Sequence, residues 1–107
     1  MPTPVLQRNL TNTVVQLAGG PSTLYSLTCS NSTSRPVFVQ LFNQAAGAVT
    51  LGITTPDHQY SIPPLGSVAV PIPAPGILFA NGIQVAATLN DAGTIAAPPG
   101  VSVYATV

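Results

Sequence analysis

The residues that could carry acid–base or nucleophilic chemistry are few in this chain of 107 residues. Its single histidine, His58, directly follows Asp57, and serine and threonine are abundant, so by composition alone a Ser-His-Asp triad could be assembled. Adjacent residues of a strand point to opposite faces, however, and no nucleophile-elbow sequence accompanies the pair. We therefore interpret TPDHQ, residues 55–59, as a turn in which Asp57 caps its own backbone.

The other reactive groups are too scattered to indicate a site. Asp57 and Asp91 both lie in turn sequences, and one His, one Cys and two Asp give no metal-ligand spacing. Cys29 has no partner for an internal disulfide, and its apolar strand predicts a small buried hydrophobe. Asn9-Leu10-Thr11 and Asn31-Ser32-Thr33 match the glycosylation sequon, and without a visible secretory signal we interpret both as chance matches. We predict no catalytic residue, no metal and no cofactor, and a protein that is not an enzyme.

Charge is the unusual feature of the composition. Two basic and two acidic residues make up 4% of the chain, where about 25% is usual. With only Arg8 and Arg35, no basic patch can neutralise phosphates, which argues against a nucleic-acid partner. A surface this poor in ionised groups, on a chain of zero net charge, favours association with other proteins.

Neither long uncharged region predicts insertion into a membrane. Residues 36–56 contain Gly47 and Gly52, and proline repeatedly interrupts residues 63–75. Neither region therefore offers the roughly 20-residue apolar helix that a span requires. The N-terminal MPTPVLQRNL has no basic stretch followed by an apolar one, so we expect no signal peptide and assembly in a host cytoplasm.

Short runs rich in β-branched residues, separated by turns rich in Pro and Gly, predict an all-β fold. The expected strands are residues 13–18, 22–30, 36–43, 48–53, 58–62, 66–72, 82–89 and 101–107. This spacing is typical of a single small antiparallel β-sandwich of about eight strands, jelly-roll or Ig-like. We place the sandwich at residues 13–107, after an extended N-terminal arm, residues 1–12, in which Pro2 and Pro4 disfavour a helix.

Two segments leave alternatives open. Strand 36–43 is apolar on both faces, so it requires a second layer or a partner. Asn81-Gly82 lies between apolar runs, which favours a two-residue hairpin turn. The other interpretation is a strand that begins at Gly82 after a proline-stiffened loop, with Phe79 closing one end of the core.

The run IPPLGSVAVPIPAPGILFANGIQVAAT, followed by GVSVYATV at the C-terminus, resembles small β-sandwich virion proteins of tailed bacteriophages. The resemblance covers about residues 22–107 and brings no catalytic or ligand motif with it. It implies a capsid decoration (cement) protein or a small head or tail component. The N-terminal arm also resembles the arms by which cement proteins reach neighbouring capsid subunits.

We therefore expect a structural virion protein on the capsid surface that stabilises the shell. Its expected partner is the major capsid protein, between whose subunits it would bind, or another virion protein. A homo-oligomer is expected, with a trimer favoured because it suits a local threefold axis. The residues expected to contact a partner are Val5, Leu6, Arg8, Leu10, Arg35, Phe38 and Phe42. The alternative is a carbohydrate-binding or host-adhesion module of a phage tail or fibre, with Tyr60 as the stacking platform in a chain that lacks Trp.

Overall fold

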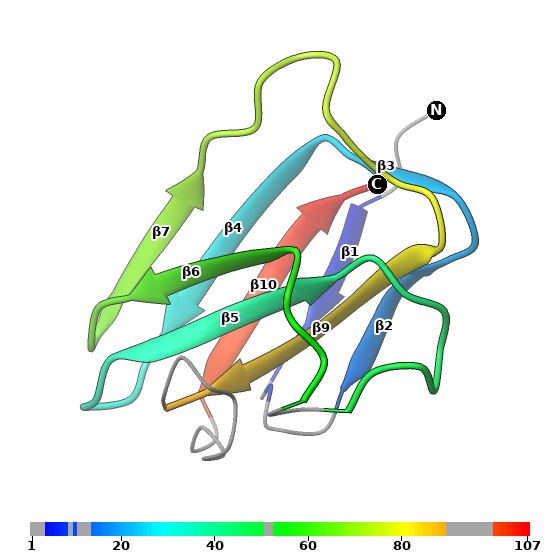
Figure 1. Cartoon of the computed structure of the whole chain (residues 1–107). Coiled ribbons are helices and arrows are strands. Elements are labelled where there is room, and N and C mark those ends of the chain that lie inside the picture. Colours follow the sequence, from blue (N-terminus) through cyan, green and yellow to red (C-terminus); the bar gives the residue numbers. More distant parts are fainter. Residues whose placement is uncertain (1–3, 9, 11–13, 51–52, 90–99) are drawn as a thin grey trace.

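Two antiparallel sheets lie face to face in the computed structural model, which describes residues 4–8, 10, 14–50, 53–89 and 100–107 (Figure 1). Sheet I has the order β1-β10-β4-β7, formed by Pro4–Gln7, Val101–Thr106, Ser26–Asn31 and Gly66–Val70. Sheet II has the order β2-β9-β5-β6, formed by Val15–Gly19, Gly82–Thr88, Val37–Phe42 and His58–Ile62. A short ladder joins β3, Ser22–Leu24, to β8, Ile77–Phe79. The predicted β-sandwich is confirmed.

The strands pair from the two ends of the chain inward. β1 pairs with β10, β2 with β9, β3 with β8, β4 with β7 and β5 with β6, always antiparallel. The chain is thus one long hairpin, and the additional pairs β10–β4 and β9–β5 roll it into two sheets. This connectivity is that of a jelly roll, so of the two sandwich types expected, the jelly roll is found and the Ig-like arrangement is not.

Alternation along the strands builds the core between the sheets. β4 and β10 each direct every second residue inward, and β5 and β9 do the same from sheet II. The inward side chains are almost all aliphatic, as a half-buried strand requires. Those of the four central strands are Leu27, Cys29, Val37, Val39, Leu41, Ile83, Val85, Ala87, Val101, Val103 and Ala105.

Most of the expected strands are present, and two differ. β6 has the expected bounds, and the strands expected at 36–43, 66–72, 82–89 and 101–107 are found one or two residues shorter. The strand expected at 22–30 is two strands, because the chain leaves the short ladder for sheet I at Tyr25. The strand expected at 48–53 is wrong: Thr50 accepts turn hydrogen bonds from the N–H groups of Ile53 (3.1 Å) and Thr54 (2.8 Å), while residues 51–52 lie outside the described part.

The segment expected to be an N-terminal arm is extended, but its described residues belong to sheet I. Val5 lies opposite Ala105 and Gln7 opposite Val103 in the β1–β10 ladder. Leu10 donates its backbone N–H to the carbonyl of Val101 (2.7 Å), and its side chain is 1% exposed in the core. Residues 4–7 and Leu10 are therefore part of the sandwich that we expected to begin at residue 13.

The second interpretation of Asn81-Gly82 is the one found. β8 pairs with β3, whereas β9 pairs with β2 and β5, so no hairpin joins β8 to β9. Gly82 begins β9 with a φ of 118°, and Phe79 is buried. A Cβ at Gly82 would lie only 3.0 Å from the carbonyl oxygen of Ala18 in β2, so the start of β9 requires glycine.

The outward face of sheet II is covered by the chain itself at its two central strands, β5 and β9, whereas Gln16 of β2 and Gln59 and Ser61 of β6 are exposed on the same face. Its side chains Gln40, Phe42, Gln84, Ala86 and Thr88 are buried although they point away from the core. The β5–β6 connection contributes to this cover: the side-chain amide of Gln84 donates to the carbonyl of Gln44 (3.2 Å). The second layer that β5 requires is therefore supplied within the chain.

No helix long and apolar enough to cross a membrane occurs in the described residues.

Candidate interaction face and adjoining hollow

Sheet I leaves its outward face open to solvent. The register aligns alternate residues of its four strands on this face, and all are partly or fully exposed. We call this set the open face: Pro4, Leu6, Ser26, Thr28, Ser30, Ser67, Ala69, Ser102, Tyr104 and Thr106. None of these side chains is charged, and six of the ten carry an aliphatic hydroxyl. Such a face offers hydrogen bonds without the desolvation penalty of ions.

One row of residues crosses the middle of the open face. Leu6 lies opposite Tyr104, Tyr104 opposite Thr28, and Thr28 opposite Ala69. Leu6 is 46% exposed and Tyr104 49% exposed, so the row presents an aliphatic and an aromatic side chain side by side. An exposed apolar pair within a polar surround is typical of a protein contact surface.

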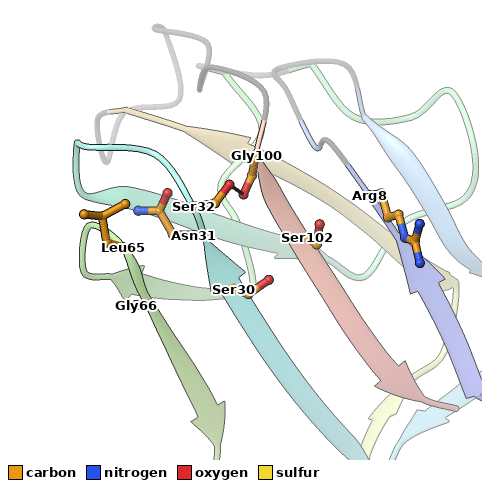
Figure 2. A pocket seen from close by; sticks show the side chains of 8 residues that line it. All are labelled: Arg8, Ser30, Asn31, Ser32, Leu65, Gly66, Gly100 and Ser102. Carbon is orange, nitrogen blue, oxygen red and sulfur yellow. Dashed lines mark hydrogen bonds between the residues drawn. The ribbon is translucent and has the colours of Figure 1, made fainter.

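A hollow of about 410 Å³ opens at the end of the open face where β4 ends and β10 begins (Figure 2). Ser30 and Ser102 lie in its middle, Arg8 on one side and Leu65 on the other. Ser32 and Gly100 form its third side, where the Ser32 hydroxyl donates to the carbonyl of Gly100 (3.0 Å). The described part of the chain places no carboxylate in contact with the guanidinium of Arg8.

The buried side chain of Asn31 fixes the loops beside the hollow. Its amide nitrogen donates to the carbonyls of Arg35 (2.8 Å), Pro63 (3.1 Å) and Ile62 (3.4 Å). Its amide oxygen accepts from the backbone N–H of Thr33 (2.9 Å) and from the Thr33 hydroxyl (2.6 Å). One side chain thus joins the β4–β5 turn to the β6–β7 turn, and the hollow is held in shape before any ligand arrives.

Two backbone positions at the hollow are conformationally restricted. Gly100 has a φ of 121°, and a Cβ there would lie 2.5 Å from the Ser32 hydroxyl oxygen, so only glycine allows the Ser32–Gly100 contact. Leu65 adopts a φ of 53°, a left-handed conformation that costs a non-glycine residue about 1–2 kcal/mol. Its side chain is nevertheless 76% exposed at the edge of the hollow.

Of the residues expected to contact a partner, the structure brings Leu6 and Arg8 together on the open face and its hollow. Val5 points inward and packs against the core. Arg35 is exposed in the β4–β5 turn, and Phe38 is half-buried on sheet II. These two residues therefore lie away from the open face.

Leu10 and Phe42 cannot present contact area in this conformation. Leu10 is 1% exposed and Phe42 is fully buried. The sequence pattern indicated an apolar surface at both positions because it does not show which part of the chain covers them. The sequence did not indicate Ser30, Ser102 or Tyr104 as surface positions of interest. Ser102 and Tyr104 do alternate with the apolar residues of the last strand, and this is the signal that could have identified them.

The groups considered for catalysis are engaged in packing and turns. The Asp57 carboxylate accepts a hydrogen bond from the backbone N–H of Asn43 (2.6 Å), so this bond caps a segment 14 residues earlier in the chain and not the backbone of Asp57 itself, as we had expected. The His58 ring stacks parallel to that of Tyr60, with centroids 6.4 Å apart, and lies 5.7 Å from that of Phe79. Burial raises the pKa of the Cys29 thiol to about 12, which leaves it protonated and unreactive.

Tyr60 does not offer the exposed ring that a sugar platform requires. Its ring is half-buried and packs against the core. Burial raises the pKa of the Tyr60 hydroxyl, and the nearby Cys29 adds to this shift.

No cluster of three or more metal-ligating side chains occurs among the described residues. Compared with known families, curated proteins and solved structures, the chain matches no family model, no curated sequence and no solved structure.

Proposed function

We propose that this chain is a non-enzymatic structural protein that coats a protein assembly, docking through the open face of sheet I. The observation that carries this proposal is the difference between the two sheets. The chain buries the centre of the outward face of sheet II, on β5 and β9, yet leaves an uncharged face with Leu6 and Tyr104 at its centre on sheet I. The absence of charge among these described residues makes their desolvation inexpensive.

The assembly we propose is a bacteriophage capsid, with the chain as a decoration protein that binds between major capsid subunits as a homo-oligomer, a trimer being favoured. The resemblance of residues 62–88 and 100–107 to phage virion proteins supports this choice. Jelly rolls are also common in viral capsid proteins. Because two apolar side chains bury less than the roughly 800 Å² per partner of a standard interface, firm attachment depends on repetition around a symmetric shell.

Co-sedimentation tests this function. The purified chain is mixed with capsids of tailed phages that have been stripped of decoration proteins, and the pelleted fraction is measured. We expect the wild-type chain to pellet with a capsid and Tyr104→Lys to bind at least about tenfold more weakly, since the ammonium group would be buried at the contact.

The matched control is Leu78→Lys, which places the same charge at an exposed leucine of β8, away from the open face. It should pellet like the wild type. A wild-type chain that pellets with no capsid, or two lysine variants that bind equally well, would contradict the proposed function.

A further inference from the structure

We propose that the hollow beside the open face binds an acidic sugar, as the terminal residue of a glycan. This inference rests on other observations than the proposed docking function, although Ser30 and Ser102 belong to both the open face and the hollow. It rests on three kinds of group that the fold places around one cavity: a cation, free hydroxyls and an apolar wall, contributed by Arg8, by Ser30 and Ser102, and by Leu65 (Figure 2).

Arg8 provides the carboxylate contact. It is one of two cations in the sequence, and the guanidinium fork suits a carboxylate in two-point contact. The other arginine, Arg35, does not line the hollow. The Asp57 carboxylate is engaged by the backbone N–H of Asn43 in the β5–β6 connection, so the described residues leave Arg8 available for an external anion.

The middle of the hollow provides hydroxyl contacts. Ser30 and Ser102 are Cα partners on adjacent strands, so their side chains lie side by side on the open face. No hydrogen bond within the described chain engages either hydroxyl. Each can donate one hydrogen bond and accept others, which matches the hydroxyl groups of a sugar ring better than it matches a hydrocarbon.

The edge of the hollow provides an apolar contact that is held in place. Leu65 is exposed in a left-handed conformation, and its backbone N–H donates to the carbonyl of Thr33 (3.0 Å). The β6–β7 turn that contains Leu65 is also held by Asn31, whose side-chain amide donates a hydrogen bond to the carbonyl of Pro63 (3.1 Å). An N-acetyl methyl group on the sugar would contact Leu65 while its carboxylate meets Arg8 on the opposite side.

The size of the hollow fits this ligand. Its volume of about 410 Å³ lies near the lower end of the roughly 300–1,000 Å³ typical of small-molecule sites. One sugar ring with its substituents fits such a space, and the open mouth leaves room for the glycosidic link to the rest of a glycan.

Titration of the ¹⁵N-labelled chain at low salt tests the proposal, with the amide signals of Arg8, Ser30 and Ser102 as the readout. The probes are the methyl glycosides of N-acetylneuraminic acid, glucuronic acid and glucose, and N-acetylleucine. We expect shifts confined to the hollow with both acidic sugars, tightest for N-acetylneuraminic acid because it carries the methyl group. Glucose, which lacks the carboxylate, should bind at least about tenfold more weakly.

The variants identify the groups responsible. Arg8→Gln should weaken binding of the acidic sugars at least about tenfold, whereas Arg35→Gln, which removes the same charge elsewhere, should leave it unchanged. Leu65→Gly should abolish the preference for N-acetylneuraminic acid over glucuronic acid. Because glycine accepts a positive φ, this variant should fold at least as well as the wild type, so its effect on binding is not a folding defect.

Three results would overturn the proposal. The first is the absence of any shift in the hollow with either acidic sugar, and the second is equal loss of binding in Arg8→Gln and Arg35→Gln. The third is binding of N-acetylleucine as tight as that of the sugars, which would assign the hollow to the carboxyl terminus of a peptide.

Discussion

Asn31 holds two turns together through a single buried amide, and its role could not be recognised from the sequence. There it is one of two sequon asparagines in a chain rich in Ser and Thr. In the fold its oxygen accepts two hydrogen bonds and its nitrogen reaches three carbonyls, so its side chain is fully engaged within the protein. Such a role depends on carbonyl groups about 30 residues away, which no local pattern encodes.

Replacing Asn31 should therefore be costly for stability. We expect Asn31→Ala to lower the free energy of unfolding by about 2–4 kcal/mol, because it leaves the Thr33 N–H and several carbonyls without a partner. Urea denaturation followed by circular dichroism measures this change. Asn81→Ala is the control, since its side chain makes only an exposed bond of 3.5 Å to Asn43 and should cost less than about 0.5 kcal/mol. Equal losses in the two variants would contradict the role assigned to Asn31.

At the scale of the elements, the sequence predicted strands well wherever alternation is strong. The last strand and the strand that begins at Gly82 alternate clearly, and both are found within a residue of the expected bounds. Residues 48–53 carry a similar run of β-branched and aliphatic residues, but 48–50 form no strand, because hydrogen bonds to Thr50 form a turn instead. Propensity is a weak guide when tertiary contacts decide the pairing.

The open face and the hollow depend on register, which the sequence did not reveal. Ser30 and Ser102 are about 70 residues apart in the chain and meet only because β4 pairs with β10. The same limit applies at the N-terminus. Leu10 follows three polar residues in four positions, and nothing local indicates that it enters the core.

The burial of Leu10 determines how an N-terminal truncation should affect folding. A separate arm could be removed while the β-sandwich stays folded, but removal of residues 1–10 takes away β1 and a core side chain together. We expect this truncation to lose cooperative thermal unfolding. Leu10→Ala should lower the free energy of unfolding by about 2–5 kcal/mol, as is usual for a buried leucine.

Leu6→Ala is the control for this prediction, because Leu6 lies in β1, which the truncation also removes, and is half exposed. It should change the free energy of unfolding by less than about 1 kcal/mol. If the truncated chain unfolded with the same midpoint as the wild type, β1 would have to be a separable arm after all.

At the scale of the whole molecule, the strands pair in nested order, the first with the last. A chain with only 4% charged residues then needs a means other than charge to prevent its sheets from pairing with those of another molecule. Charge usually prevents sheets from joining at their edges, and here it is nearly absent. One feature of the described fold acts in its place at an edge: the chain puts Pro4 on the edge strand β1 of sheet I. Away from the edges, its β5–β6 connection covers part of the outward face of sheet II. The face that stays open is then the one available to a partner.

A fold with so few ionisable groups should also reveal individual titrations in its stability. Cys29 is fully buried, and desolvation raises the pKa of its thiol from 9.0 to about 12. Between these values the unfolded chain loses the proton while the native chain keeps it, so the free energy of unfolding falls as the pH rises. The slope is about 1.4 kcal/mol per pH unit, and the contribution is constant below the pKa of the unfolded thiol.

Cys29→Ala removes the thiol while every other titrating group remains in both chains, although it also removes the contribution of Cys29 to the raised pKa of Tyr60. Near pH 7 the wild type should be more stable by about 1–2 kcal/mol, since the variant leaves a small cavity in the core. As the pH rises from about 9 towards 11, this advantage should shrink and then reverse, because the variant has no thiol to ionise when it unfolds. Urea denaturation of both chains at several pH values measures the difference. A difference that stays constant up to pH 11 would show that the native thiol ionises as readily as the unfolded one, and that Cys29 is not sealed between the two sheets.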